Sequence, residues 1–243
     1  MANIVRASFD QGQIPTIACI DKATVGLGAD FDALIAALQT FVERDFAPVW
    51  GTHARLIKAA DFVAGSWALV FLDNADVQGA LGYHDLTPDG LPLSKVFVKT
   101  TLADKQKVSV TACHEVAEML VDPAINLWAE APDGRLYAYE MSDAVEEVEY
   151  EIDGIAMSDF VYPAYFEGFR KPKSVQFDYC RKVTKPFQLL SGGYSIVRKG
   201  GTVRQIFGSA EKKKRFQRED RRGHRSHYRQ PGVVLRKRSR LVR

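Results

Sequence analysis

Several common signals are missing from the 243-residue chain. Its only cysteines are Cys19, Cys113 and Cys180, widely spaced and without a CxxC pair, which excludes a disulfide-stapled secreted domain and indicates a reducing compartment. The longest apolar run, from Phe62 to Leu72, has 11 residues, whereas a membrane-spanning helix needs roughly 18 to 20. The first residues lack the basic and apolar regions of a secretory signal. We therefore expect a protein of the cytoplasm or of a viral particle, with no membrane partner.

Three catalytic signatures are also missing. The chain has no GxxxxGK[ST] phosphate loop, no GxGxxG dinucleotide fingerprint and no GxSxG nucleophile elbow. These absences argue against a nucleotide-driven enzyme and against a serine hydrolase.

Charge is distributed unevenly along a chain of ordinary globular composition, with 46% hydrophobic and 26% charged residues. Residues 195–243 hold 17 Lys and Arg against 3 Asp and Glu, whereas residues 1–194 hold 16 against 27. The net charge of +3 therefore combines an acidic body with a basic tail. Basic residues are absent from Leu136 to Phe169, where nine acids gather: Glu140, Asp143, Glu146, Glu147, Glu149, Glu151, Asp153, Asp159 and Glu167.

The hydrophobic pattern predicts helices and strands in one large domain over residues 1–208, followed by a basic tail over 209–243. A helix is expected from the N-cap Asp30 to Arg44, ending before Pro48. Another is expected from Thr111 to Val121. The expected strands are Trp67–Leu72, Gly82–Leu86, Lys95–Lys99, Tyr194–Arg198 and Thr202–Phe207, with a turn at Thr87–Gly90 and a terminal hairpin formed by the last two strands. The fold class is therefore α+β.

The second helix carries the pattern His114-Glu115-Val116-Ala117-Glu118. Residues four apart lie on one helix face, so His114 and Glu118 can bind one metal ion. Glu115 is turned by about 100° around the axis, which places it beside the metal as a general base. The pattern corresponds to the HExxH helix of metallopeptidases with its second histidine replaced by glutamate.

Longer strings around this helix carry a family resemblance. GYHDLTPDG begins at Gly82, HEVAEMLVDP at His114, YEMSDAVE at Tyr139 and YEIDGIAMSDFVYPAYF at Tyr150. Together they resemble a poorly characterised zincin-like metallopeptidase group encoded by viruses and bacteria, over roughly residues 30–195. The resemblance implies a zincin-like mixed sheet with an amphipathic backing helix, an active-site helix and an edge strand that lines the substrate cleft.

The resemblance also implies the site residues. The metal ligands are expected to be His114, Glu118 and Glu140, with Glu115 as the general base and Asp143 supporting the ligands. Asp122 is expected to support them as well or to cap the helix, because it lies about 12 Å along the axis from His114. The cofactor is expected to be Zn²⁺ or another divalent metal, since two carboxylates favour harder ions than two histidines do.

Other interpretations of the same residues remain open. His-Glu-x-x-Glu can also be the polar face of an amphipathic helix, and Cys113 is expected to be a buried structural residue because it points away from His114. His84 could add a ligand from the edge strand, but we interpret it as a hydrogen-bonded structural residue and leave it outside the site.

The basic tail has three candidate roles: binding nucleic acid, docking on an acidic protein, or acting as a solvated segment. Its candidate binding residues are Lys212, Lys213, Lys214, Arg215, Arg221 and Arg222. Because the chain has its own acidic stretch, we expect the tail to contact it near the cleft, in the same or a neighbouring subunit.

Two functions follow from the sequence. The first is a metal-dependent peptidase that hydrolyses peptide or protein substrates by means of metal-bound water and Glu115. The alternative is a non-catalytic structural protein of a viral particle or other large assembly, whose tail binds nucleic acid or acidic partners.

Overall fold

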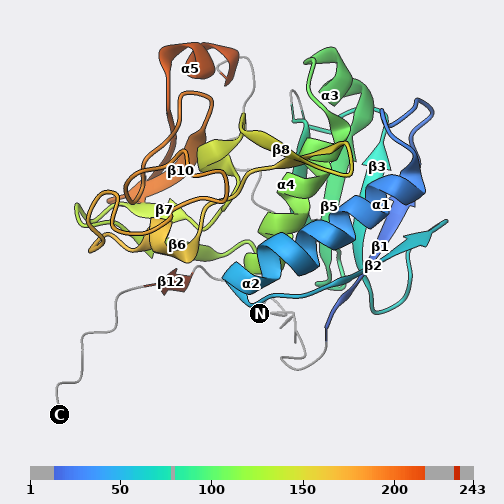
Figure 1. The fold of residues 1–243 in the computed structure, drawn as a ribbon, viewed down its shortest axis with the longest axis horizontal. Coiled ribbons are helices and arrows are strands. Elements are labelled where there is room, and N and C mark those ends of the chain that lie inside the picture. Colours follow the sequence, from blue (N-terminus) through green and yellow to red (C-terminus); the bar gives the residue numbers. More distant parts are fainter. Residues whose placement is uncertain (1–13, 78–79, 217–232, 236–243) are drawn as a thin grey trace.

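The computed structural model describes residues 14–77, 80–216 and 233–235, and its N-terminal half contains a five-stranded sheet (Figure 1). The strand order is β2-β1-β3-β5-β4. Four neighbouring strands run parallel, and β4 pairs antiparallel with β5 at the edge of the sheet. The strands are β1 (Thr16–Asp21), β2 (Arg55–Ala59), β3 (Trp67–Leu72), β4 (Gly82–Leu86) and β5 (Pro92–Phe97).

The predictions for β3 and β4 are confirmed to the residue, and the turn between β4 and β5 is closed by the Gly90 N–H donating to the Thr87 carbonyl. The strand predicted at Lys95–Lys99 is wrong at both ends, because β5 starts earlier and ends at Phe97. Phe97 pairs with Leu72, the last residue of β3, so the chain has no further parallel partner and turns into a helix.

The first helical segment begins where the sequence predicts, with the Asp30 carboxylate accepting a hydrogen bond from the Ala33 N–H. It consists of α1 (Phe31–Thr40), a π-helical stretch (Phe41–Phe46) and α2 (Ala47–Trp50). The predicted end before Pro48 is wrong. Pro48 lies in the first turn of α2, where a missing N–H is tolerated, and the helix ends at Gly51 in the left-handed conformation.

The central helix is α4 (Val108–Val121), preceded by the short α3 (Val98–Ala103). The sequence predicted its end correctly but placed its start three residues too late, at Thr111. Every residue of α4 from Val108 to Leu120 is buried. The helix contacts β4 and β5 of the first sheet and the β9 strand of a small hairpin, which together surround it. Its polar residues are therefore held inside the protein.

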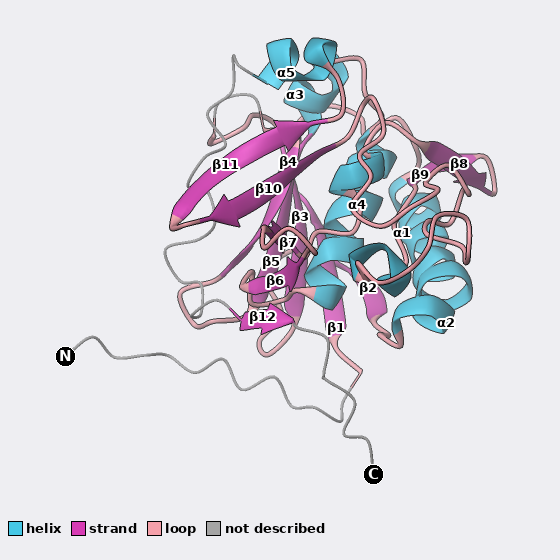
Figure 2. Cartoon of the chain, turned by 90° about the vertical axis from the view of Figure 1, so that its left-hand side faces the viewer, coloured by secondary structure: helices cyan, strands magenta, loops and turns pink. Residues whose placement is uncertain are grey.

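The C-terminal half contains a second five-stranded sheet in the order β11-β10-β7-β6-β12. Figure 2 shows its long β10–β11 hairpin on the side of α4 opposite α1, and this hairpin confirms the sequence prediction. The remaining elements are β6 (Leu127–Glu130), β7 (Leu136–Ala138), β8 (Glu149–Ile152), β9 (Ile155–Ser158), β10 (Tyr194–Lys199), β11 (Thr202–Phe207), β12 (Val233–Leu235) and the 3-10 turns η2 (Asp143–Val145) and η3 (Pro163–Phe166).

Two described parts of the segment after Gly208 lie against the rest of the chain. Helix α5 (Ala210–Phe216) contacts β11, and β12 pairs parallel with β6. The α+β class is thus confirmed, with mixed sheets and helices throughout the described residues. Within that part of the chain, no helix is both long and apolar enough to cross a bilayer.

Candidate metal centre

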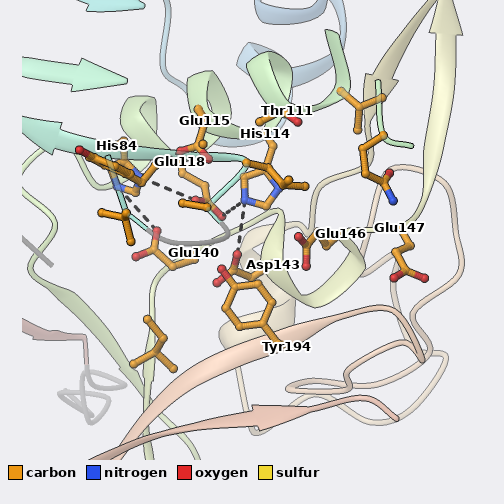
Figure 3. A pocket seen from close by; sticks show the side chains of 18 of the residues that line it. His84, Thr111, His114, Glu115, Glu118, Glu140, Asp143, Glu146, Glu147 and Tyr194 are labelled. Carbon is orange, nitrogen blue, oxygen red and sulfur yellow. Dashed lines mark ion pairs between the residues drawn. The ribbon is translucent and has the colours of Figure 1, made fainter. Parts of the chain in front are cut away.

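A pocket at the buried face of α4 collects most of the acidic and histidine residues that the sequence analysis selected (Figure 3). Helix α4 contributes His114, Glu115 and Glu118. Strand β4 contributes His84, and the segment that follows β7 contributes Glu140 and Asp143. The helix, the edge strand and this acidic segment therefore meet at one place.

Two groups of three side chains have the spacing to hold a metal ion, and the first of these trios consists of His114, Glu118 and Asp143. The Nε2 atom of His114 lies 3.2 Å from Oε1 of Glu118 and 3.4 Å from Oδ1 of Asp143. Ligand atoms about 2.0 to 2.1 Å from a tetrahedrally bound zinc ion lie about 3.3 to 3.4 Å apart. The two separations from His114 are therefore compatible with a metal ion shared by these side chains.

A second trio consists of His84, Glu115 and Glu118. The Nδ1 atom of His84 lies 3.8 Å from Oε2 of Glu115 and 3.7 Å from Oε2 of Glu118. The two oxygens of Glu118 thus face different histidines, with Oε1 toward His114 and Oε2 toward His84. The structure brings His84 into the cluster that the sequence analysis had kept it out of.

In the acidic segment after β7, Asp143 rather than Glu140 lies beside His114. Asp143, expected to support the ligands, lies against His114. Glu140, expected to be the third ligand, instead has its Oε2 atom 3.7 Å from Nε2 of His84. Neither metal-binding trio among the described residues contains Glu140. The short η2 turn, which begins at Asp143, orients this residue toward α4.

The cluster contains buried polar atoms that have no hydrogen-bond partner among the described residues. They include His84 Nε2, Glu115 Oε2 and Asp143 Oδ1, whose nearest charged groups lie 3.4 to 3.8 Å away without hydrogen-bond geometry. Buried polar atoms are normally satisfied, because leaving one without a partner costs about 1 to 3 kcal/mol. A divalent cation at the centre would satisfy the carboxylate oxygens, so the residues present fit a metal.

Protonation of the cluster is shaped by its own charges. Burial alone would lower the pKa of His84, but the carboxylates around it, Glu140 first, raise the pKa to about 10. Burial likewise opposes the charged form of His114, yet attraction to Glu118 raises its pKa well above the usual value. For the Glu118 carboxyl group burial has the opposite effect and raises the pKa, although the nearby His114 opposes this shift. A cation that binds here must displace protons from these groups.

Glu115 lies at the closest approach between α4 and the edge strand. It is 4% exposed. A Cβ atom added to Gly82 would lie 2.8 Å from Oε1 of Glu115 and 2.9 Å from both Lys95 O and Thr111 Cγ2. Glycine at position 82 therefore allows β4 to pass directly beside the carboxylate expected to act as a base.

Asp122 and Cys113 have structural positions. Asp122 caps the end of α4 and accepts hydrogen bonds from the backbone N–H groups of Asn126 and Leu127. This contact agrees with the capping role that the sequence left open. The Cys113 thiol is fully buried near the Ser158 carbonyl, and burial raises its pKa, which disfavours the nucleophilic thiolate.

The predicted tail residues fall into three groups. Lys212 is buried and lines the pocket, whereas Lys213 and Lys214 are exposed. Arg221 and Arg222 lie outside the described residues, as does the side chain of Arg215. Part of the basic segment therefore reaches the acidic stretch, as the sequence analysis expected of the tail.

The sequence prediction left His84 outside the site, whereas the structure places it in the cluster, and Asp143 rather than Glu140 lies beside His114. The sequence held one signal for His84, because this residue lies on a predicted edge strand that precedes the motif helix. Comparisons of the chain with protein-family models, with curated proteins and with solved structures found no match.

Proposed function

We propose that the protein is a metal-dependent peptidase with a zincin-like fold. The observation that carries this proposal is the convergence of His114 Nε2, Glu118 Oε1 and Asp143 Oδ1 in a pocket that Glu115 also lines. A parallel sheet with an antiparallel edge strand beside the motif helix supports the assignment.

The metal is held by one imidazole and two carboxylates in this proposal. This donor set suits Zn²⁺ and also accepts harder divalent ions such as Mn²⁺. When bound, a divalent ion supplies Lewis-acid chemistry by polarising a carbonyl group and by acidifying water. Ser142 supports the set, since its backbone N–H donates to Oε1 of Glu118.

Glu115 takes the general-base role because it follows His114 directly and so points to one side of the ligand face. The Nδ1 atom of His84 lies 3.8 Å from Oε2 of Glu115, and we infer that His84 helps to orient this carboxylate. Glu115 is therefore placed to accept a proton from water and pass it to a leaving amine.

Strand β4 supplies a binding edge for an extended peptide. It is the last strand of its sheet, and Gly82, Tyr83 and His84 all line the pocket. A sheet edge can hold a peptide through backbone hydrogen bonds, which recognise peptide independently of sequence. This geometry favours a peptide over other hydrolysable substrates.

The test combines metal content with turnover in the purified full-length protein. We expect about one equivalent of divalent metal, together with metal-dependent cleavage of a mixed fluorogenic peptide library. Glu115→Gln should keep the metal and lose about 10²- to 10⁴-fold in kcat. His53→Ala, which alters an exposed histidine, serves as the control. Absence of bound metal, or unchanged turnover in Glu115→Gln, would contradict the proposal.

A further inference from the structure

A lysine from the C-terminal helix is buried in the wall of the candidate catalytic pocket. The side chain of Lys212 is 3% exposed, and its Nζ atom lies 2.7 Å from Oε2 of Glu146 and 3.6 Å from Oε1 of Glu147. Lys212, Glu146 and Glu147 line the same pocket as His114 and Glu118. Figure 3 shows Glu146 and Glu147 on the side of His114 away from His84.

The two glutamates are held in place by close backbone packing. The Leu190 N–H donates to the Ala144 carbonyl. A Cβ atom on Gly192 would overlap Glu147, and one on Gly193 would overlap the Ala144 carbonyl. Gly192 and Gly193 therefore allow the chain before β10 to pack closely against η2 and Glu147.

The lysine, in contrast, belongs to a short peripheral element. Helix α5 has 7 residues and contacts β11. The Ser209 hydroxyl accepts from the Lys212 N–H and so positions the first turn. The neighbouring Lys213 and Lys214 are exposed, so Lys212 is the described lysine of this helix that enters the pocket.

Burial of this ammonium group requires acidic partners. An unpaired buried charge is strongly unfavourable, and a lysine gives up side-chain entropy when it is fixed. Glu146 and Glu147 provide the compensating charge, since their carboxylates lie 2.7 and 3.6 Å from the same Nζ atom. The same two carboxylates would pair with a lysine or arginine side chain of another chain that enters this pocket.

We propose that Glu146 and Glu147 form a binding site for the cationic side chain of a lysine or arginine in a peptide substrate, and that Lys212 fills this site in the free protein. The substrate class rests on the proposed peptidase function. Helix α5 is then an internal competitor, which a basic peptide must displace before it can occupy the pocket.

The test measures peptide binding without turnover. Full-length protein carrying Glu115→Gln is titrated into a fluorescein-labelled Ala-Ala-Lys-Ala-Ala peptide, and into the same peptide with norleucine in place of lysine, and anisotropy is recorded. Adding Lys212→Met, which keeps the apolar stem and removes the charge, should tighten binding of the lysine peptide by about tenfold or more, the scale of one charge-assisted contact. The norleucine peptide should gain little.

Two further variants separate this site from general charge effects. Lys213→Met removes the same charge from an exposed neighbour and should leave both affinities unchanged. Adding Glu146→Gln to Lys212→Met should abolish the preference for lysine over norleucine. In the variant with Lys212→Met, equal affinities for the two peptides or no measurable binding of the lysine peptide would overturn the proposal. A Lys212→Met change that does not tighten binding of the lysine peptide would overturn it as well.

The outcomes also distinguish this inference from the proposed function. Lysine-selective binding without hydrolysis by the metal-loaded wild type would leave the cation site standing and remove the peptidase. Hydrolysis without a preference for basic residues would support the peptidase function and reject the cation site.

Discussion

The two sides of the pocket contain the same kinds of residue in different geometry. On one side, His114 lies 3.2 and 3.4 Å from its carboxylate partners. On the other, His84 lies 3.7 to 3.8 Å from Glu115, Glu118 and Glu140. Glu118 belongs to both sides. Composition alone therefore does not distinguish a metal site from an ion-pair network.

The difference in these distances follows from the element that carries each histidine. His114 and Glu118 are one helical turn apart on a rigid buried helix, which fixes their spacing. His84 comes from a strand, and its carboxylate partners come from α4 and from the segment after β7. We propose that the closely spaced His114 side binds the metal and that the more widely spaced His84 side orients Glu115.

The largest expected effect comes from removing one carboxylate on each side. Asp143→Ala should reduce metal affinity by more than the roughly 10- to 100-fold that loss of an outer partner costs. Glu140→Ala should change it by less than about tenfold. Competition with a zinc chelator measures both affinities, and thermal unfolding checks that each variant is folded. The opposite order of effects would restore Glu140 as the ligand and reject the assignment to Asp143.

A smaller effect is expected from His84→Gln, which keeps a polar side chain on β4. Metal content should remain at about one equivalent, while kcat/KM falls by about 10- to 100-fold because Glu115 loses a neighbour that orients it. Elemental analysis and peptide turnover give the two values. A fall from two equivalents to one would instead show that the His84 side binds its own metal ion.

An effect on stability rather than on the chemistry of the site is expected where β4 passes α4. Gly82→Ala places a methyl group within 3 Å of Glu115 and Thr111, so the free energy of unfolding should fall by about 1 to 3 kcal/mol. Gly26→Ala is the matched control, because a Cβ atom there meets nothing within 4 Å. Denaturant unfolding measures both. Equal stabilities would show that the edge strand can move away from the helix.

Much of the fold was predictable because it depends on local patterns. Strand β3 was identified from its branched and aromatic run, and β4 and the β10–β11 hairpin from the turn residues beside them. The continuation of the first helical segment through Pro48 was missed, because a proline in the first turn of a new helix looks in sequence like a helix terminator.

The candidate site was predictable only where one element carries it. His114, Glu115 and Glu118 share a helix, so their relative placement follows from helix geometry. The choice between Glu140 and Asp143 depends on the path of an irregular segment, and the contribution of His84 depends on how α4 packs against β4. Neither depends on a local preference that a single sequence reveals.

The metal assignment is tested most directly by anomalous diffraction at the zinc edge from crystals of the full-length protein grown with Zn²⁺. The account predicts a peak bonded to His114 Nε2, Glu118 Oε1 and Asp143 Oδ1, at about 2.0 to 2.2 Å from each. A peak confined to the His84 side, or none between the three side chains, would contradict it.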